Sequence, residues 1–174
     1  MSVVINGSAG VTTNSGAVYN GLQYGTAQAT TSGTSVLFTG IPSWASKVTV
    51  IFQGVGTNGT NSPQLQLGTS SGVVTTGYTG QTGQTNNAPP VTGVTTGLRC
   101  SFDWTSSLNL TGQVYFYKIT GTTWVGQGTL SRSDGLCQMS GTYITLSGTL
   151  DRMNLTTIGG TDTLRVGQIN ILYE

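Results

Sequence analysis

Hydrophobic and polar positions alternate with a period of two wherever the chain shows a pattern. Near the C-terminus, Ile169, Ile171 and Tyr173 recur at every second position. Successive side chains of a β-strand point to opposite faces, so this spacing predicts half-buried strands. The segments 48–52 and 114–119 contain more apolar residues than this alternation requires, with β-branched or aromatic residues on both faces. We expect these two to be central strands covered on both sides.

Turn signals separate the predicted strands. They include Asn-Gly at 58–59, Asp-Gly at 134–135, Gly-Gly at 159–160 and many Thr-Gly or Ser-Gly pairs. No stretch of ten or more residues combines helical periodicity with good helix formers. Short strands with frequent turns predict an all-β fold, an antiparallel β-sandwich of jelly-roll-like topology.

The chain divides into an N-terminal segment and one larger domain. We expect residues 1–34 to form short extended pieces that make up an arm docking on a neighbour. We expect residues 35–174 to form the sandwich. Within the sandwich, residues 69–97 are rich in Gly, Thr, Gln and Asn and poor in apolar residues. We expect a long surface loop there, and long loops are frequent sites of partner contact.

Ionisable side chains are scarce in this chain. It has six Lys/Arg, five Asp/Glu and no histidine among 174 residues. No serine or cysteine can therefore be activated by a histidine, and we expect no enzyme activity and no catalytic residue. Cys100 and Cys137 have no further ligands for a zinc site, so no metal and no cofactor are expected. Both thiols are either free and buried or joined in an oxidising setting.

The charge pattern also bears on partners. The formal net charge is +1 and the cations are scattered, which speaks against nucleic acid as a partner. No window approaches the roughly 20 apolar residues that span a bilayer, so membrane insertion is not expected. The first ten residues lack the pattern of a secretory signal, which predicts synthesis in a cytosol. Near-zero net charge and few charged residues to protect strand edges favour a homo-oligomer.

Glycoside hydrolysis is the enzymatic alternative, because it needs only two carboxylates on either side of the scissile bond. The internal candidates are Asp103, Asp134, Asp151 and Asp162. Asp103 lies between Phe102 and Trp104, an apolar setting that could raise the pKa of its carboxyl group. Asp151 precedes Arg152, which predicts a local ion pair. Nothing in the sequence pairs these acids, so a structural role is favoured for each.

Aromatic residues are the candidates for ligand contact. Tyr78, Trp104 and Trp124 could present flat rings to sugars while Asn and Thr side chains bond the hydroxyls. We expect a glycan contact at these residues, with Tyr78 exposed in the long loop. The structural alternative is that Trp44 and Trp124 begin strands and pack into the sandwich.

Several segments resemble a β-rich module of tailed-bacteriophage virion structural and tail-fibre proteins. They are residues 40–59 (GIPSWASKVTVIFQGVGTNG), 117–126 (YKITGTTWVG), 146–155 (LSGTLDRMNL) and the C-terminal stretch 160–174 (GTDTLRVGQINILYE). The opening Ile5 to Val11 (INGSAGV) is similar to leaders that precede phage fibre domains.

The resemblance implies a virion protein assembled in the host cytoplasm, commonly a trimer in fibres, without a cofactor. It implies contacts either with host surface carbohydrate or with other virion proteins. We therefore expect a tail-fibre-like or receptor-binding module, or else a capsid or tail decoration protein with purely structural contacts. A secreted bacterial sugar-binding domain is a third interpretation, which the absence of a signal pattern disfavours.

Overall fold

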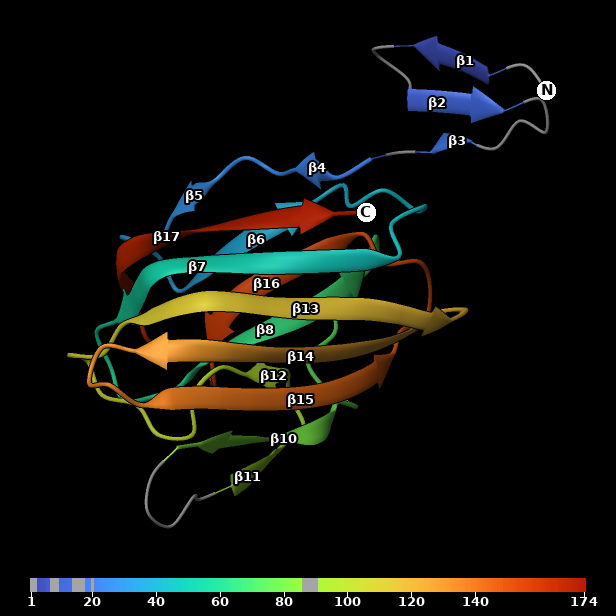
Figure 1. Ribbon diagram of the computed structural model, residues 1–174. Helices are drawn as coiled ribbons and strands as arrows, with labels where there is room; N and C mark the ends of the chain where they lie inside the picture. The colour runs from blue at the N-terminus through green and yellow to red at the C-terminus, as the bar shows by residue number, and fades with distance from the viewer. Residues whose placement is uncertain (1–2, 7–9, 14–17, 20, 86–90) are drawn as a thin grey trace.

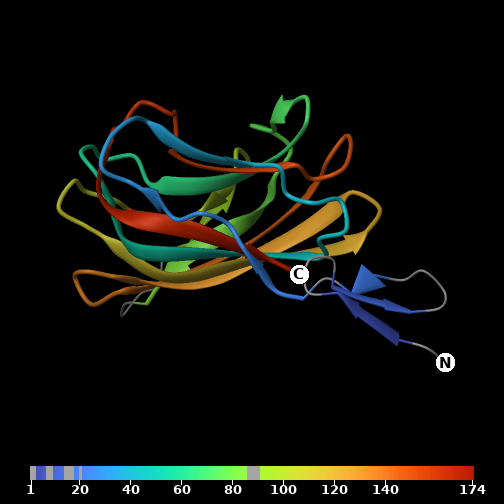
Figure 2. The same ribbon diagram turned by 90° about the horizontal axis from the view of Figure 1, so that it is seen from above.

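The computed structural model describes residues 3–6, 10–13, 18, 19, 21–85 and 91–174. Within those ranges all regular structure is strand, and the strands form three antiparallel sheets. The two larger sheets pack face to face as two layers, which Figures 1 and 2 show from two directions. The prediction of an all-β antiparallel sandwich is confirmed. Its jelly-roll topology stays a prediction.

The large sheet forms the front layer in Figure 1. Its hydrogen-bonded strands follow one another in the order β11 (Val91–Val94), β10 (Thr79–Gln84), β15 (Cys137–Thr145), β14 (Thr123–Arg132), β13 (Leu110–Thr120), β7 (Lys47–Thr57), β17 (Leu164–Tyr173) and β4 (Gln23–Tyr24). A further short strand, β5 (Gln28–Ala29), also pairs with β17, next to β4.

The small sheet lies behind the large one. Its order is β12 (Leu98–Arg99), β8 (Pro63–Thr69), β16 (Arg152–Thr157) and β6 (Ser35–Thr39), with β9 (Gly72–Val73) paired to β8. A separate N-terminal sheet, drawn apart from the sandwich in Figure 1, has the order β1 (Val3–Asn6), β2 (Gly10–Thr13) and β3 (Val18–Tyr19).

The core lies between the two larger sheets and follows the period-two pattern. In β7 and β13 the inward side chains are fully or almost fully buried, among them Phe52 and Phe116. They meet inward residues of β8 and β16 such as Leu67 and Met153, which are also buried. Burial of this apolar surface is the main favourable term in folding the sandwich.

The expectation that the dense segments are covered on both faces is wrong for residues 114–119, whereas four of the five residues at 48–52 are buried. β7 and β13 are central in the large sheet, but the outer face of β13 is open to solvent, with Tyr117 41% exposed. The dense run arises because outward aromatics alternate with inward apolar residues. The small sheet has strands buried on both faces: all seven residues of β8 are buried, and so are five of the six residues of β16.

The expected loop over 69–97 is also corrected in part. It contains β9, β10 and β11, and the β10–β11 pair extends the large sheet from β15. Main-chain hydrogen bonds to a neighbouring strand do not require apolar side chains, so a segment of Gly, Thr and Gln can still form a strand. Residues 86–90, within the proline-containing stretch, lie outside the described residues.

The predicted arm is in part an element of the sandwich. β4 and β5 pair with β17, and Thr30 is completely buried. The Thr30 amide donates a 2.9 Å hydrogen bond to the Gly167 carbonyl, and its hydroxyl donates to the Val166 carbonyl at 2.8 Å. Residues 21–34 therefore cover the β17 edge. Docking of the preceding residues on a neighbour stays a prediction.

On the side of the sandwich away from β17, side chains join the two larger sheets. The hydroxyls of Thr82 and Ser140, on β10 and β15, both donate to the Arg99 carbonyl on β12, at 2.8 Å and 2.6 Å. These bonds tie the edge of the small sheet to the large sheet. β11 remains at the outer edge, with Val91 63% exposed.

Replacing Gly126 by alanine is expected to lower the free energy of unfolding by about 1 to 3 kcal/mol, because the core there is already filled. A Cβ atom at Gly126 would lie 2.5 Å from Phe116 Cε1 and 2.9 Å from Leu98 Cδ1. The matched control is Gly141→Ala on β15, where a Cβ would meet no atom within 4 Å. Urea unfolding of both variants checks this, and equal losses would contradict it.

Candidate functional site

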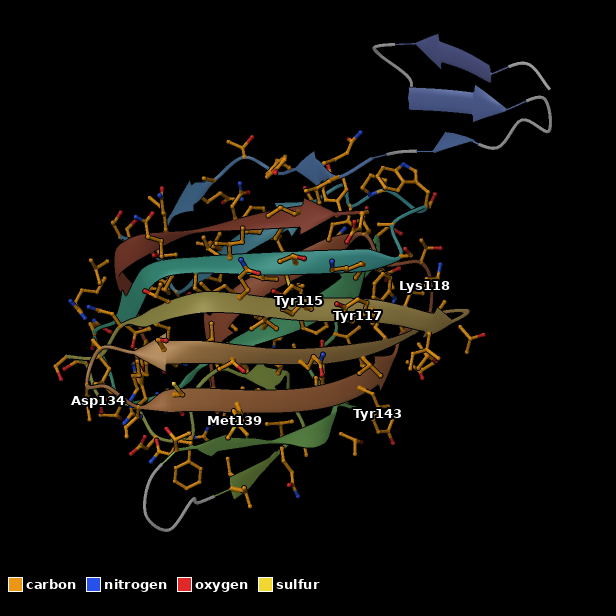
Figure 3. All side chains as sticks on the ribbon, in the orientation of Figure 1. Tyr115, Tyr117, Lys118, Asp134, Met139 and Tyr143 are labelled. Carbon is orange, nitrogen blue, oxygen red and sulfur yellow. The ribbon has the colours of Figure 1, made fainter. Side chains whose placement is uncertain are left out.

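The outer face of the large sheet carries a group of exposed aromatic and amide side chains. We call it the outer platform. Figure 3 shows four of its members on the face turned to the viewer. Alternation places them there, because their neighbours in sequence point into the core. The platform consists of Gln113, Tyr115, Tyr117, Gln127, Met139 and Tyr143.

Pairing between strands brings these residues together. Tyr115 on β13 lies opposite Gln127 on β14, which lies opposite Gly141 on β15. Gly141 has no side chain, and the space above it is open. Met139 and Tyr143 stand on either side of Gly141 along β15, each 50% exposed. Glycine therefore leaves a gap between two large exposed side chains.

A shallow hollow of about 460 Å³ lies over β13, β14 and β15 on this face. Its lining includes Gln113, Tyr115, Gln127 and Met139. Amide groups that both donate and accept hydrogen bonds thus stand beside an aromatic ring and a flexible thioether side chain.

The two tyrosines of β13 are held by a neighbouring ion pair. Their rings stack with centroids 6.3 Å apart and planes at 26°. The Lys47 ammonium lies 5.6 Å and 5.7 Å from the Tyr115 and Tyr117 centroids, and it is paired with the carboxylate of Glu174. The hydrogen bond to Glu174 raises the pKa of Lys47, so this lysine stays protonated at neutral pH.

The chemistry of the platform suits a neutral hydroxylated ligand. Flat aromatic faces offer apolar contact to the C–H face of a sugar ring, while amides bond its hydroxyls. Lys47 beside the platform is compensated by Glu174, whereas Lys118, the exposed residue after Tyr117, forms no ion pair among the described residues. One uncompensated cation is too little positive charge to hold a polyanion.

The residues predicted from the sequence as glycan contacts lie in the core. Tyr78, Trp104 and Trp124 are only 2%, 5% and 2% exposed. Buried rings cannot stack on a ligand outside the protein, so these three contacts are corrected. The alternative that these tryptophans pack into the sandwich holds for Trp124. Trp44 is instead 39% exposed, and its ring centroid lies 5.8 Å from that of Tyr173.

Hydrogen bonds explain two of these burials. The Tyr78 hydroxyl accepts a 2.7 Å bond from the Leu67 amide, and burial raises the pKa of Tyr78 to about 12. The Trp104 indole donates to the Thr57 hydroxyl at 2.6 Å. Tyr115 and Tyr117 were missed because residues 114–119 were interpreted as covered on both faces. Alternation with the buried Val114 and Phe116 was the available signal.

The aspartates have structural partners. Arg132, with a side chain only 3% exposed, contacts the carboxylates of both Asp103 and Asp134. The Asp103 side chain is 56% exposed, so the apolar setting expected for it is wrong. Asp151 pairs with Arg152 at 2.9 Å, which confirms the predicted local pair.

The fourth acid, Asp162, has a partner in a connecting segment distant in sequence. Its carboxylate accepts hydrogen bonds from the Asn61 amide at 2.7 Å and from the Asn61 side chain at 2.9 Å. Both bonds hold the segment after β7 against the segment before β17. Asp162 therefore serves to join two connections.

Cys100 and Cys137 are free thiols, the first buried and the second half-buried. Burial raises the pKa of Cys100, which keeps that thiol protonated. The described ranges contain no group of three or more His, Cys, Asp or Glu residues placed to hold a metal ion. Nor does any helix there have the length and apolar character to cross a membrane.

Comparison of the chain with protein-family models, curated proteins and solved structures gives no match. The likeness of residues 40–59 and 160–174 to phage virion modules stays a prediction from the sequence.

The pair between Arg132 and Asp134 predicts a pH-dependent contribution to stability. Two hydrogen bonds, of 2.9 Å and 2.7 Å, join the guanidinium to the Asp134 carboxylate, and they lower the pKa of Asp134. Asp134→Asn is expected to reduce the free energy of unfolding by about 1 kcal/mol at pH 7, since the carboxylate is partly exposed.

The sign follows from the lowered pKa. The contribution is fully present above the ordinary pKa of aspartate, about 3.9, and is lost as the pH falls through the lower folded value. The difference between the native chain and Asp134→Asn should thus be constant from pH 7 to about 5 and shrink below about 3.9. Urea unfolding across this range measures it, and a difference that persists unchanged at pH 2 would contradict the ion pair.

Proposed function

We propose that this protein is a structural module of a tailed-bacteriophage virion that contacts host surface glycans through the outer platform. The observation that carries the glycan contact is the grouping of the exposed Tyr117 and Tyr143 on the same sheet face as a shallow hollow lined by Tyr115 and glutamine amides. The virion assignment rests on the resemblance of four sequence segments.

Binding at such a platform would be weak at each site. A shallow, open hollow buries little of a ligand, so single-site dissociation constants on the order of 1 mM are expected. Oligomerisation would compensate for this weakness, because linked copies that bind together gain avidity without new contacts. A trimer, which the resemblance favours, would present three platforms to one cell surface.

A capsid or tail decoration protein is the second candidate, and one surface favours it. Leu22 and Tyr24 are 48% and 65% exposed beside the end of β17, where Trp44 also lies against Tyr173. Exposed apolar groups at one place are typical of a contact between subunits. A second copy of this chain is the partner we infer, because the chain carries almost no net charge to oppose association.

Tyr117→Ala and Tyr143→Ala are each expected to weaken glycan binding about tenfold, because each removes an aromatic face. The measurement is retention of the protein in affinity electrophoresis through gels containing purified bacterial capsule or lipopolysaccharide O-chain. The matched control is Val91→Ala, which removes an exposed apolar side chain from the edge of the same sheet. If both tyrosine variants are retained like the native chain, the platform is not the contact.

Tyr24→Ala separates the second candidate from the first. It is expected to shift the molecular mass measured by sedimentation equilibrium towards the monomer, because it truncates the most exposed aromatic of that surface. Tyr117→Ala is the control and should leave the mass unchanged. A native chain that is monomeric at all concentrations would contradict the self-association.

A further inference from the structure

A polar pocket lies on the outer face of the small sheet, on the opposite side of the molecule from the outer platform. Gln64 and Gln66 alternate along β8 with core leucines, and Asn154 and Thr156 alternate along β16 with the core residues Met153 and Leu155. The strand register places Gln66 opposite Asn154 and Gln64 opposite Thr156. Four polar side chains therefore form one compact square on this face.

These side chains are buried although they face away from the core. Gln64, Gln66 and Asn154 are only 3%, 4% and 9% exposed. Connecting segments contribute Thr34, Thr75, Gly159 and Gly160 to the lining of a hollow of about 460 Å³ over this face. Its size falls within the usual range of small-molecule sites, about 300 to 1,000 Å³.

A chain of hydrogen bonds fixes the orientation of the amides. Asn154 Nδ2 donates to Gln66 Oε1 at 3.2 Å, and Gln66 Nε2 donates to the Thr96 carbonyl at 2.9 Å. The Thr96 hydroxyl donates to Gln64 Oε1 at 2.8 Å, and Gln64 Nε2 donates to the Thr157 carbonyl at 3.3 Å. Each bond sets which end of its amide is the donor, so the pocket is organised before any ligand enters.

The same bonds leave part of the hydrogen-bonding capacity unused. An amide NH₂ has two hydrogens, and the bonds above use one hydrogen from each of Gln64, Gln66 and Asn154. Within the part of the chain that the structure describes, Asn154 Oδ1 accepts no hydrogen bond, and this oxygen is not shut off from solvent. The spare amide hydrogens and this oxygen can therefore bond a ligand that supplies both donors and acceptors.

We propose that this pocket, the amide pocket, binds one uncharged sugar residue. Sugar hydroxyls donate and accept at once, as the spare amide hydrogens and Asn154 Oδ1 require. No charged residue lines the pocket, and a carboxylate or phosphate would be buried there without a counter-charge. Arg99, the neighbour of Gln64 on β12, instead points its guanidinium at the Ser101 carbonyl and the Ser62 hydroxyl.

The pocket and the outer platform would recognise sugars differently. No aromatic residue lines the pocket, so recognition there is by hydroxyl hydrogen bonds rather than by stacking. The amide pocket does not depend on the proposed role of the platform, because the two sites lie on different sheets.

The test is a titration of the ¹⁵N-labelled protein with neutral monosaccharides, observed through the side-chain NH₂ resonances of Gln64, Gln66 and Asn154. The probes are glucose, galactose, rhamnose and N-acetylglucosamine. At least one sugar should shift these resonances and saturate with a Kd on the order of 1 mM. Absence of a saturable shift with all four sugars up to about 50 mM would overturn the proposal.

Two variants make the result specific. Thr75 is exposed and lines the pocket, so Thr75→Trp is expected to block it without disturbing the core and to weaken binding at least tenfold. Tyr117→Ala, on the other sheet, should leave the Kd unchanged. Full binding by Thr75→Trp would overturn the proposal. So would shifts of these resonances that depend on protein concentration alone, because a second copy of the chain would then occupy the pocket.

Discussion

The packing of the two larger sheets determines what the molecule shows to its surroundings. Val114 and Phe116 are completely buried between the sheets, so the residues that alternate with them, Tyr115 and Tyr117, must point outward. A shift of the register by one residue would place both tyrosines in the core and the apolar pair in solvent. The free energy of apolar burial therefore holds the outer platform in place, although none of its rings belongs to the core.

Amides and hydroxyls perform in this protein many of the tasks that charged residues perform elsewhere. The few ion pairs are local or lie at the ends of strands, as with Arg132 and Lys47. Hydroxyls close one side of the sandwich through the Arg99 carbonyl, and amides connect β8 with β16. Such neutral groups avoid the desolvation penalty of buried charge while keeping donors and acceptors in fixed directions.

The two outer faces differ because their surroundings differ. The face of the large sheet is open, and its tyrosines and glutamines are accessible over a wide area. On the face of the small sheet the glutamines are almost fully buried, and residues of connecting segments line the hollow beside them. A surface of exposed rings suits weak, repeated contact with a polymer, whereas a polar hollow with fixed amides suits a single small ring. Both proposed sugar contacts use neutral polar side chains, which stand on an exposed sheet face in the first case and line a hollow in the second.

Local periodicity in the sequence was sufficient for the all-β class, the antiparallel sandwich and the Asp151–Arg152 pair, because each depends on residues close together in the chain. Which face of residues 114–119 met the core, and whether Tyr78 was exposed, depended on strand pairing. The amide pocket depends on it as well: Gln66 and Asn154 are 88 positions apart in sequence and meet through the register of β8 and β16. Alternation identifies two faces of a strand, but only contacts between distant segments decide which strands are neighbours and which face is covered.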